Sequence, residues 1–477
     1  LYMHLFCLKI PRRGTVIMDT YLPLSLLRWF SCVLFLASFK HNNAMLEFAE
    51  VKQIAAGIKS DIIAWRRELH SYPELMYQEN KTSSLIQSVL QDMGISFSAG
   101  WAKNTRQHAA RPITGLGSTG VVAEIGTGKP PIVALRSDMD ALPIHEDTPV
   151  EFRSKSDGKM HACGHDGHIS MLLGAAKLLH RLNSAATLPG TVRLIFQPAE
   201  EGGAGAKRMW EEGVLKDVSR IFGMHLWPSL PSGSIGGRAG VAMAAGDFFE
   251  FKIKGGGAHG AMPHQGIDPV TAAAAVIQSL QMIVSRETDP LEAAVISVTK
   301  LTAGDAFNVI PAEAIVGGTI RALSVAGLEL LQKRLEEVAS QVAAAYRCKM
   351  ENLTFMPDFF PPTSNDVGLW NWLQSPEAGV TGGPSSPAMH WDLPPTMGSE
   401  DFAFYTQNVP GAFIFLGQGS GRSKLAGSGD EVWFTNTTVH SPRFHMDEDV
   451  LDFGAALHTQ LALRSLYAMQ SSAHREL

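Results

Sequence analysis

The sequence predicts an α/β protein in which a larger domain, with a mixed sheet flanked by helices, is interrupted by a smaller α+β satellite domain. Short β-rich runs alternate with helical runs between residues 119 and 225, as layered α/β folds do. From Asp247 the order changes to strand, helix, strand, strand and helix, which indicates a separate module. After this module the chain returns to an apolar strand and a closing helix.

The elements of the first part follow from local patterns. Apolar residues recur at three- and four-residue steps from Met45 to Leu69, which predicts a helix. The runs GVVAEIG, PIVALRS, TVRLIFQ and RIFGMHL each predict a strand. Between them, His168–Leu182 and Ala204–Glu212 predict helices.

The second part is predicted in the same way. DFFEFKIKG, AAVISVTKL and AIVGGTIRAL read as strands, Val270–Ser285 and Leu328–Tyr346 as helices, and Glu351–Phe355 as a final strand of the module. GAFIFLG is then a strand and Asp447–Met469 a helix. The expected domains are a leader region (1–45), a main domain in two parts (46–240 and 357–471), a satellite domain (241–356) and a tail (472–477).

Both ends of the sequence carry signals of the secretory pathway. Met18 opens a segment whose apolar run Trp29–Phe39 is short for a membrane span and typical of a signal peptide that is removed. A signal anchor that stays is the alternative. The last four residues, HREL, resemble an endoplasmic reticulum retention signal. We therefore expect the endoplasmic reticulum lumen, and no stable membrane span after cleavage.

Composition excludes some classes of protein. The net charge is −6 and no basic stripe is present, so we expect no nucleic-acid partner. Cys7 and Cys32 fall in the leader, which leaves Cys163 and Cys348 and excludes a disulfide framework. A single Cys163–Cys348 bridge remains open, and it would remove Cys163 from any metal site.

The stretch HACGHDGH (161–168) concentrates residues that bind metals. Cys163 and His165 are two apart in a glycine-rich turn, so their side chains can converge on one ion. Thiolate and imidazole suit zinc-like ions, and carboxylates extend the range to manganese. A redox site would need a second thiol nearby, and a polar loop is the plainer alternative. His440, in the late loop VHSPRFH, is a further candidate ligand.

Other candidate residues follow predicted strands. Glu200 and Glu201 come directly after TVRLIFQ, where one carboxylate can bind metal while the other acts as a general base. A solvated acidic helix start is the alternative. His225 ends the next strand, and Asp138 and Asp140 end an earlier one. Parallel strands end at one edge of a sheet, so these side chains are expected close together.

Two glycine motifs match G-x-G-x-x-G without the context of a dinucleotide site. Gly115–Gly120 precedes a strand instead of a helix. Gly255–Gly260 follows a strand, but AMPHQGIDP separates it from the next helix. A dinucleotide site needs strand, turn and helix in immediate succession, so we expect no such cofactor.

Nine motifs, in order, resemble one enzyme superfamily. They are RRELHSYPEL, LRSDMDALPIHE, MHACGHDGH, GTVRLIFQPAEEG, GMHLWP, GGGAHGAMPHQGIDP, NVIPAEA, MGSEDFAFY and HSPRFHMDED. Together they resemble the dinuclear metalloamidohydrolases of the aminoacylase–carboxypeptidase superfamily, and within it the plant auxin amidohydrolases, which are similar to bacterial hippurate hydrolases. The resemblance covers roughly residues 46–471.

The resemblance implies a metal centre and the roles of its residues. The implied metal ligands are Cys163, His165, Glu201, His225 and His440. Glu200 would be the general base, and Asp140 would orient a ligand from behind. The cofactor would be two divalent ions; manganese is the expectation for the family, whereas the softness of Cys163 suits zinc.

The resemblance also assigns roles to the satellite domain, which would mediate a homodimer. His259 would polarise the scissile carbonyl, and Asn308 and Arg321 would lie near the substrate. The expected reaction is hydrolysis of an N-acyl amino acid, in particular an indole-3-acetyl conjugate, releasing free auxin and an amino acid. A general N-acyl amino acid hydrolase and a catalytically silent conjugate-binding protein are the alternatives.

One segment departs from the family pattern. Residues 95–119 are longer and more basic than the usual link into the first strand. We interpret the extra residues as a tolerated surface insertion or a retained piece of intron.

Overall fold

The computed structural model describes residues 46–104, 115–381, 387–419, 422–423 and 433–473. These residues belong to one compact unit, which begins at Met45. The expected leader, residues 105–114 of the predicted insertion (95–119) and the HREL tail lie outside the described residues. Residues Phe97–Lys103 of that segment form the first strand, β1.

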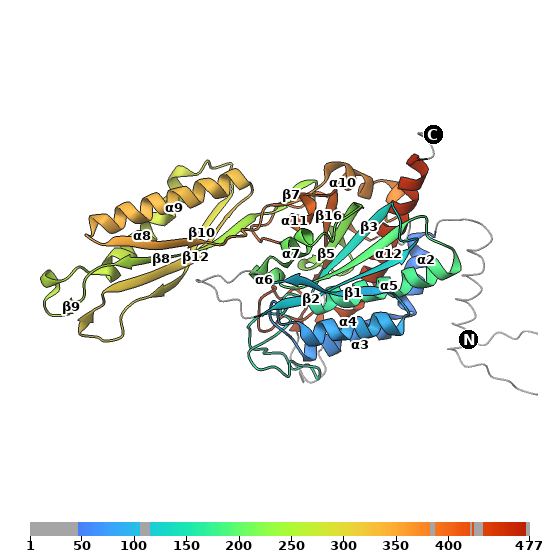
Figure 1. Cartoon of the computed structure of the whole chain (residues 1–477), viewed down its shortest axis with the longest axis horizontal. Coiled ribbons are helices and arrows are strands. Elements are labelled where there is room, and N and C mark those ends of the chain that lie inside the picture. Colours follow the sequence, from blue (N-terminus) through green and yellow to red (C-terminus); the bar gives the residue numbers. More distant parts are fainter. Residues whose placement is uncertain (1–45, 105–114, 382–386, 420–421, 424–432, 474–477) are drawn as a thin grey trace, which may run out of the picture. The chain divides into compact units, whose positions relative to one another are not determined.

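The main domain is built on an eight-stranded mixed sheet, which confirms the predicted α/β class (Figure 1). Its strands, in spatial order, are β1 (Phe97–Lys103), β2 (Gly117–Gly126), β4 (Thr191–Gln197), β3 (Ile132–Asp138), β5 (Val218–Pro231), β16 (Gly411–Gly419), β6 (Ile235–Gly236) and β15 (Met389–His390). The central strands β4, β3, β5 and β16 are parallel, and β1, β2 and β4 pair antiparallel. The carboxyl ends of the central strands therefore meet at one edge.

Helices cover this sheet because its central strands are apolar on both faces. All seven residues of β3 are buried, as expected for a parallel strand between two layers. The longest helices against the sheet are α5 (His165–Ala185) and α12 (Leu451–Ala473), which pack on each other. They approach closely at Gly174, where a Cβ atom would lie 2.8 Å from the Cβ of Ala455.

Shorter elements complete the main domain. The helices are α2 (Phe48–Ala56), α3 (Lys59–Ser71), α4 (Asn80–Asp92), α6 (Glu200–Gly203), α7 (Gly205–Glu211), α10 (Val367–Gln374) and α11 (Ala403–Thr406). The two-stranded pairs are β7 (Gly240–Met243) with β14 (Thr363–Asn365), and β17 (Arg422–Ser423) with β18 (Trp433–Phe434). No helix in the described part of the chain combines the length and the hydropathy that crossing a membrane requires.

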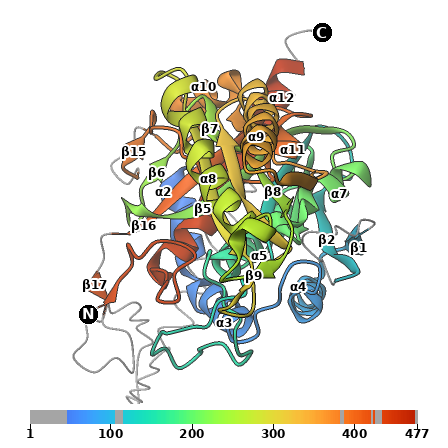
Figure 2. The same ribbon diagram turned by 90° about the vertical axis from the view of Figure 1, so that its left-hand side faces the viewer.

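A second sheet is formed by residues 245–355, with its own core. Its antiparallel strands are ordered β10 (Ala294–Thr302), β12 (Glu313–Ala322), β8 (Ala245–Lys254) and β13 (Lys349–Phe355). Helices α8 (Pro269–Met282) and α9 (Val325–Ala345) lie side by side on one face (Figures 1 and 2). The small pair β9 (Ala258–His259) and β11 (Val309–Ile310) extends from this module. The homodimer expected through it stays a prediction.

Three local expectations differ from the structure. The helix predicted over Met45–Leu69 is two helices, α2 and α3, because Gly57 caps the first and Ile58 leaves helical geometry. Helix α5 begins at His165, three residues earlier than predicted, since Gly164 takes a left-handed turn before it. Strand β5 continues to Pro231, so His225 lies within the strand and not at its end.

Helix α12 contains a buried histidine, His458, that makes the free energy of unfolding depend on pH. Burial, and next the charge of His168, lower the pKa of His458 to about 3. In the unfolded chain this imidazole titrates near pH 6.5, so the unfolded state binds more protons at lower pH. The stability that neutral His458 allows is present above pH 6.5 and is lost as pH falls from 6.5 towards 3.

We expect His458→Leu to reduce the acid sensitivity of the metal-free protein. At pH 5 the buried imidazole costs on the order of 2 kcal/mol relative to pH 7.5, and leucine does not titrate. The measurement is Tm at both pH values after chelation, with the exposed His264→Leu as control. An equal drop in Tm for His458→Leu and the wild type would contradict the assignment.

Candidate metal centre

The loop before α5 places two ligand-type side chains in the interior. Gly164 has φ +92°, a conformation that residues with a Cβ atom rarely adopt. The chain can therefore reverse between Cys163 and His165, and both side chains are buried. The amide of His440 donates to the carbonyl of Ala162 at 2.7 Å, which joins this loop to the late part of the chain.

One ring nitrogen of His165 is hydrogen-bonded, and the other faces the candidate metal centre. Its Nδ1 donates to the carbonyl oxygen of Asp140 at 2.8 Å. Its buried Nε2 makes no hydrogen bond within the described residues and faces Asp138 Oδ2 at 3.7 Å. Burial disfavours the imidazolium, but the charge of Asp138 and the bond to Asp140 raise the pKa of His165 to about 10. A divalent cation at Nε2 would take the place of that proton.

His225 is arranged in the same way on β5. Its Nδ1 donates to the carbonyl oxygen of Leu226 at 2.8 Å, and its Nε2 lies 3.4 Å from Cys163 Sγ. Burial, and next the charge of His168, lower the pKa of His225 to about 3, so the ring is neutral. Burial and the charge of Glu201 raise the pKa of the Cys163 thiol well above its usual range. The imidazole of His225 is therefore ready to bind a cation, whereas the thiol of Cys163 would release its proton when it binds one.

Glu201 and His440 complete the ligand set. His440 Nε2 lies 3.1 Å from Glu201 Oε1. Burial raises the pKa of Glu201, but the hydrogen bond and charge of His440 more than compensate and lower it. His440 is half exposed and has φ +64°, so its backbone is strained to bring the ring to the centre.

The five predicted ligands fit a pair of metal ions. Cys163, His165 and His225 form one triad, and Cys163, Glu201 and His440 form another. Within each triad the ligand atoms lie within 4.8 Å of one another. Thiolate, imidazole and carboxylate donors together suit manganese and zinc. The unbonded Nε2 of His165, buried among such donors, is accounted for by an ion at this place.

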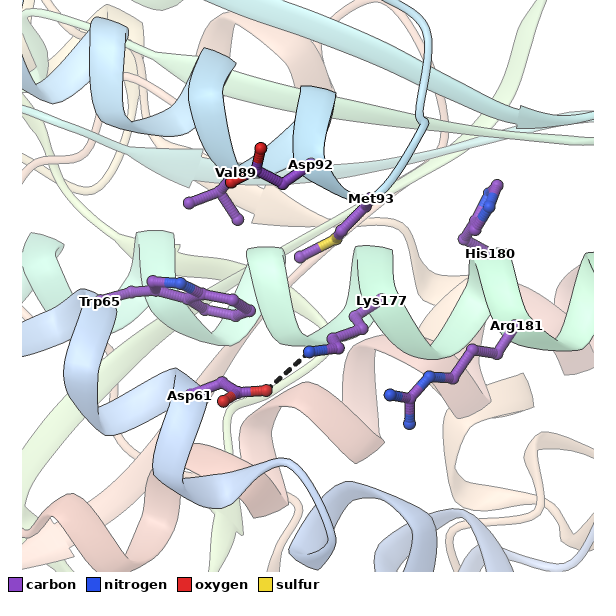
Figure 3. A pocket seen from close by; sticks show the side chains of 8 residues that line it. All are labelled: Asp61, Trp65, Val89, Asp92, Met93, Lys177, His180 and Arg181. Carbon is purple, nitrogen blue, oxygen red and sulfur yellow. Dashed lines mark hydrogen bonds and ion pairs between the residues drawn. The ribbon is translucent and has the colours of Figure 1, made fainter. Parts of the chain in front are cut away.

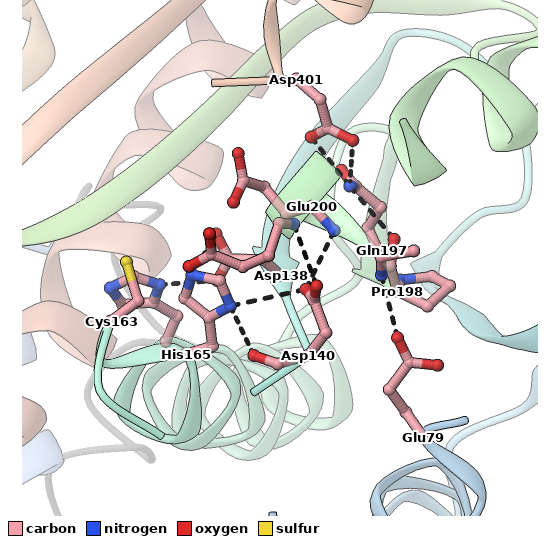
Figure 4. A network of polar contacts seen from close by, with 12 residues as sticks. Glu79, Asp138, Asp140, Cys163, His165, Gln197, Pro198, Glu200 and Asp401 are labelled. Carbon is pink, nitrogen blue, oxygen red and sulfur yellow. Dashed lines mark hydrogen bonds and ion pairs between the residues drawn. The ribbon is translucent and has the colours of Figure 1, made fainter. Parts of the chain in front are cut away.

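Asp140 supports the centre from behind (Figure 4). Its carboxylate accepts from the amides of Glu200 and Glu201, at 2.9 Å each, and its carbonyl oxygen accepts from His165. One residue therefore orients three members of the site. The backbone carbonyl of Asp140, and not its side chain, orients His165, because Asp140 Oδ1 is 3.6 Å from His165 Nδ1, too far for a hydrogen bond.

Glu200 lies beside a second cluster of buried acids. Burial, and next the charges of Glu400 and Glu201, raise the pKa of Glu200 well above its usual range. Glu400 and Asp401 are held by Arg136 Nη2, at 2.9 Å each. A carboxyl group with a raised pKa can both accept and return a proton near neutral pH, as a general base must.

Sequence reasoning missed the cluster around Arg136. Arg136 Nη1 also donates to Asp138 Oδ2 at 2.8 Å, and its Nε donates to Gln197 at 2.8 Å. Asp138 in turn accepts from His168 Nδ1 at 2.6 Å. The signal in the sequence was an arginine inside the apolar strand PIVALRS, together with the acidic pair of MGSEDFAFY.

The three residues of the satellite domain that were predicted to act on substrate do not lie together. Arg321 Nη1 donates to the carbonyl of Met397 and to Ser399 Oγ, at 3.0 and 3.1 Å. Burial lowers the pKa of Arg321, and the charge of Glu200 partly offsets this. His259 lies in β9 and Asn308 directly precedes β11, and both residues are exposed. In the described part of the chain, no hydrogen bond or ion pair joins either of them to the metal ligands.

Two further observations delimit the site. Cys163 and Cys348 are both free thiols, so the alternative disulfide is wrong. A surface hollow of about 350 Å³ between α3, α4 and α5 is lined by Trp65, Lys177 and Arg181, among others (Figure 3). It contains no residue of the centre, so the chemistry is not there.

Comparisons with known proteins agree with this geometry. The model of peptidase family M20/M25/M40 matches residues 134–464. The chain is 41% identical to the IAA-amino acid hydrolase ILR1-like 4 of Arabidopsis thaliana, over 94% of this chain and 98% of that protein. It is 39% identical to an N-acetylcysteine deacetylase of Bacillus subtilis (strain 168), over 84% and 96%. The crystal structure of Bacillus subtilis YXEP, described as a dinuclear metal-binding peptidase, matches with a TM-score of 0.65 and 36% identity, over 86% and 99%.

The support by Asp140 predicts a loss of metal affinity on substitution. Asp140→Asn would replace one carboxylate oxygen with an NH2 group, which would face one of the two backbone N–H groups that Asp140 now accepts from. Loss of a carboxylate that orients metal ligands typically weakens metal binding about 10- to 100-fold. We expect weaker binding by about that factor in a competition titration against a chelator. The exposed Asp147→Asn, in the same loop, is the control. Equal affinities of Asp140→Asn and the wild type would show that Asp140 does not support the centre.

Proposed function

Because this chain belongs to peptidase family M20/M25/M40 and is a metal-dependent amide hydrolase, we propose that it hydrolyses N-acyl amino acids, and indole-3-acetyl-amino acids in particular. The observation that carries the reaction is the convergence of five metal-ligand side chains with a buried glutamate of raised pKa. The observation that carries the substrate is 41–44% identity to IAA-amino acid hydrolases over about nine tenths of the chain.

The residues divide the reaction between them. Cys163, His165, His225, Glu201 and His440 would hold two divalent ions. When bound, such ions polarise a carbonyl and lower the pKa of water towards neutrality. Glu200 takes a proton from the attacking water and returns it to the nitrogen of the leaving amino acid. Asp140, through two backbone amides, keeps Glu200 and Glu201 in place for both transfers.

A broader acyl specificity is the second candidate. The 39% identity to an N-acetylcysteine deacetylase favours it, because that protein's name indicates a much smaller acyl group. Discrimination between acyl groups can rest on a few pocket contacts of about 1–3 kcal/mol each. The two substrates share the amide bond and the machinery, so only their relative kcat/KM separates the candidates.

We propose manganese as the metal, with zinc as the alternative. The imidazole and carboxylate donors suit manganese, whereas the thiolate of Cys163 is soft and suits zinc. Protein stripped by a chelator and reloaded with each metal separates the two.

The decisive experiment measures amino acid released from indole-3-acetyl-alanine by stripped and manganese-loaded protein, beside Glu200→Gln. We expect release only with metal, and a loss of at least about 100-fold in kcat for Glu200→Gln, because the amide cannot accept the proton. Metal content, measured on the same samples, should not change. Undiminished turnover in a metal-loaded Glu200→Gln variant would refute the mechanism, and preference for N-acetylcysteine would favour the second candidate.

We further propose that the protein resides in the endoplasmic reticulum lumen. The support is the apolar leader and the HREL tail of the sequence, both outside the described residues. Deleting residues 474–477 should move the protein from cells into the medium when it is expressed in a eukaryotic host. Full retention of the truncated protein would contradict an HREL-dependent location.

A further inference from the structure

The turn that carries Glu200 is strained at several residues. Ala199 has φ +59° and ψ +42°, and Ala204 has φ +53° and ψ +45°. Residues with a Cβ atom seldom occupy this left-handed region, and they remain there only where the surroundings hold them. Between them, Glu201 has non-helical angles and Gly202 has φ +97°. The direction of the Glu200 side chain thus depends on whatever fixes this turn.

A second buried acidic side chain, Glu79, contacts the same turn as Asp140. Glu79 Oε1 accepts from the amide of Ala199 at 3.0 Å and from the amide of Tyr77 at 2.9 Å. Its Oε2 accepts from Thr119 Oγ1 at 2.7 Å. Figure 4 shows Glu79 below Pro198 and Asp140 below Glu200, so that both side chains approach the turn from the same side in this view.

Three consecutive amides are therefore bonded to two side chains. Glu79 takes the amide of Ala199, and Asp140 takes those of Glu200 and Glu201. Asp140 lies directly after β3, whereas Glu79 comes from the segment before α4, about 120 residues earlier than the turn. The peptide before Ala199 is thus fixed by Glu79 and the two that follow by Asp140.

Tyr77 holds the other end of the same turn. Its hydroxyl donates to the carbonyl oxygen of Gly203 at 2.6 Å, and its side chain is buried. Tyr77 itself has φ +60°, and Glu79 bonds its amide. The segment from Tyr77 to Glu79 is thus a brace, with one contact at the start of the turn and one near its end.

We propose that Glu79 is a positioning residue for Glu200, and that the brace Tyr77–Glu79 aims the general base. The inference rests on the proposed function, because it assigns a role in proton transfer by Glu200. Without Glu79, the amide of Ala199 loses its acceptor and Ala199 can leave the left-handed region. The carboxylate of Glu200, the next residue, then changes its position. Glu79 is fully buried, and its described side-chain bonds go to Tyr77, Thr119 and Ala199 and to no metal ligand.

The test compares Glu79→Ala with Glu79→Gln. Glutamine keeps Oε1 as acceptor for both amides, and its Nε2 can donate to Thr119 Oγ1, so the brace survives. Alanine removes every acceptor. We expect Glu79→Ala to lower kcat 10- to 100-fold at saturating manganese, with KM within about threefold. Glu79→Gln should stay within about threefold of the wild type in both constants.

Two further variants separate positioning from folding. Tyr77→Phe removes only the hydroxyl that bonds Gly203, and we expect a three- to tenfold lower kcat with a small change in Tm. Glu74→Ala is the matched control, because Glu74 lies in the same segment and accepts from the amide and hydroxyl of Thr82, away from the turn. It should leave kcat within about twofold of the wild type. All rates are expressed per folded protein.

The outcomes are distinguishable. Unchanged kcat in folded Glu79→Ala, or equal losses in the alanine and glutamine variants, would overturn the proposal. A loss in Glu74→Ala as large as in Glu79→Ala would also overturn it, since stability alone would then explain both. The manganese dissociation constant gives a readout without turnover: it should rise in Glu79→Ala, because the turn also carries Glu201, and not in Glu79→Gln. If the wild type splits no indole-3-acetyl conjugate, the proposed substrate fails, while this affinity difference still decides on the brace.

Discussion

The guanidinium of Arg136 makes the interior of the main domain possible. Asp138, Glu400 and Asp401 are buried within hydrogen-bond distance of it, and unpaired charges there would be very costly. The three carboxylates come from two chain segments more than 260 residues apart, so Arg136 also fastens the two parts of the domain together. Burial outweighs the charge of Arg136 and raises the pKa of Glu400 to about 8 and that of Asp401 to about 6, and the charges of both acids help to raise the pKa of the nearby Glu200.

The division of labour among the carboxylates follows from their partners. Asp140 and Glu79 bond backbone amides and fix geometry. Glu201 lies against His440 and keeps its charge, as a metal ligand should. Glu200 has buried acids for neighbours and holds its proton more tightly. Four chemically similar groups thus differ in role because each meets a different neighbour.

Much of the fold, and the candidate residues of its centre, could be predicted from local patterns in the sequence, whereas the set of five metal ligands was implied by the family resemblance. Apolar runs such as PIVALRS are long enough to identify as strands, and ligand-type residues directly follow them. The left-handed Ala199 could not be predicted, because alanine gives no local signal and the bond that holds it comes from Glu79, 120 residues earlier. The partners of Arg136 are equally distant. His259 and Asn308 came from resemblance alone, and in the structure His259 lies in β9 and Asn308 directly before β11.

The strand order has a consequence for biosynthesis. β16 lies between β5 and β6 in the main sheet, yet about 180 residues, the whole second sheet among them, separate it from β5 in sequence. A ribosome adding 5–20 residues per second needs roughly 10–40 s for that stretch. During this interval β5 has an open edge, and the loop of Cys163 still lacks the later turn that contributes His440. All five ligand side chains of the centre are therefore present only after the last part of the chain, which adds both β16 and His440, has been synthesised.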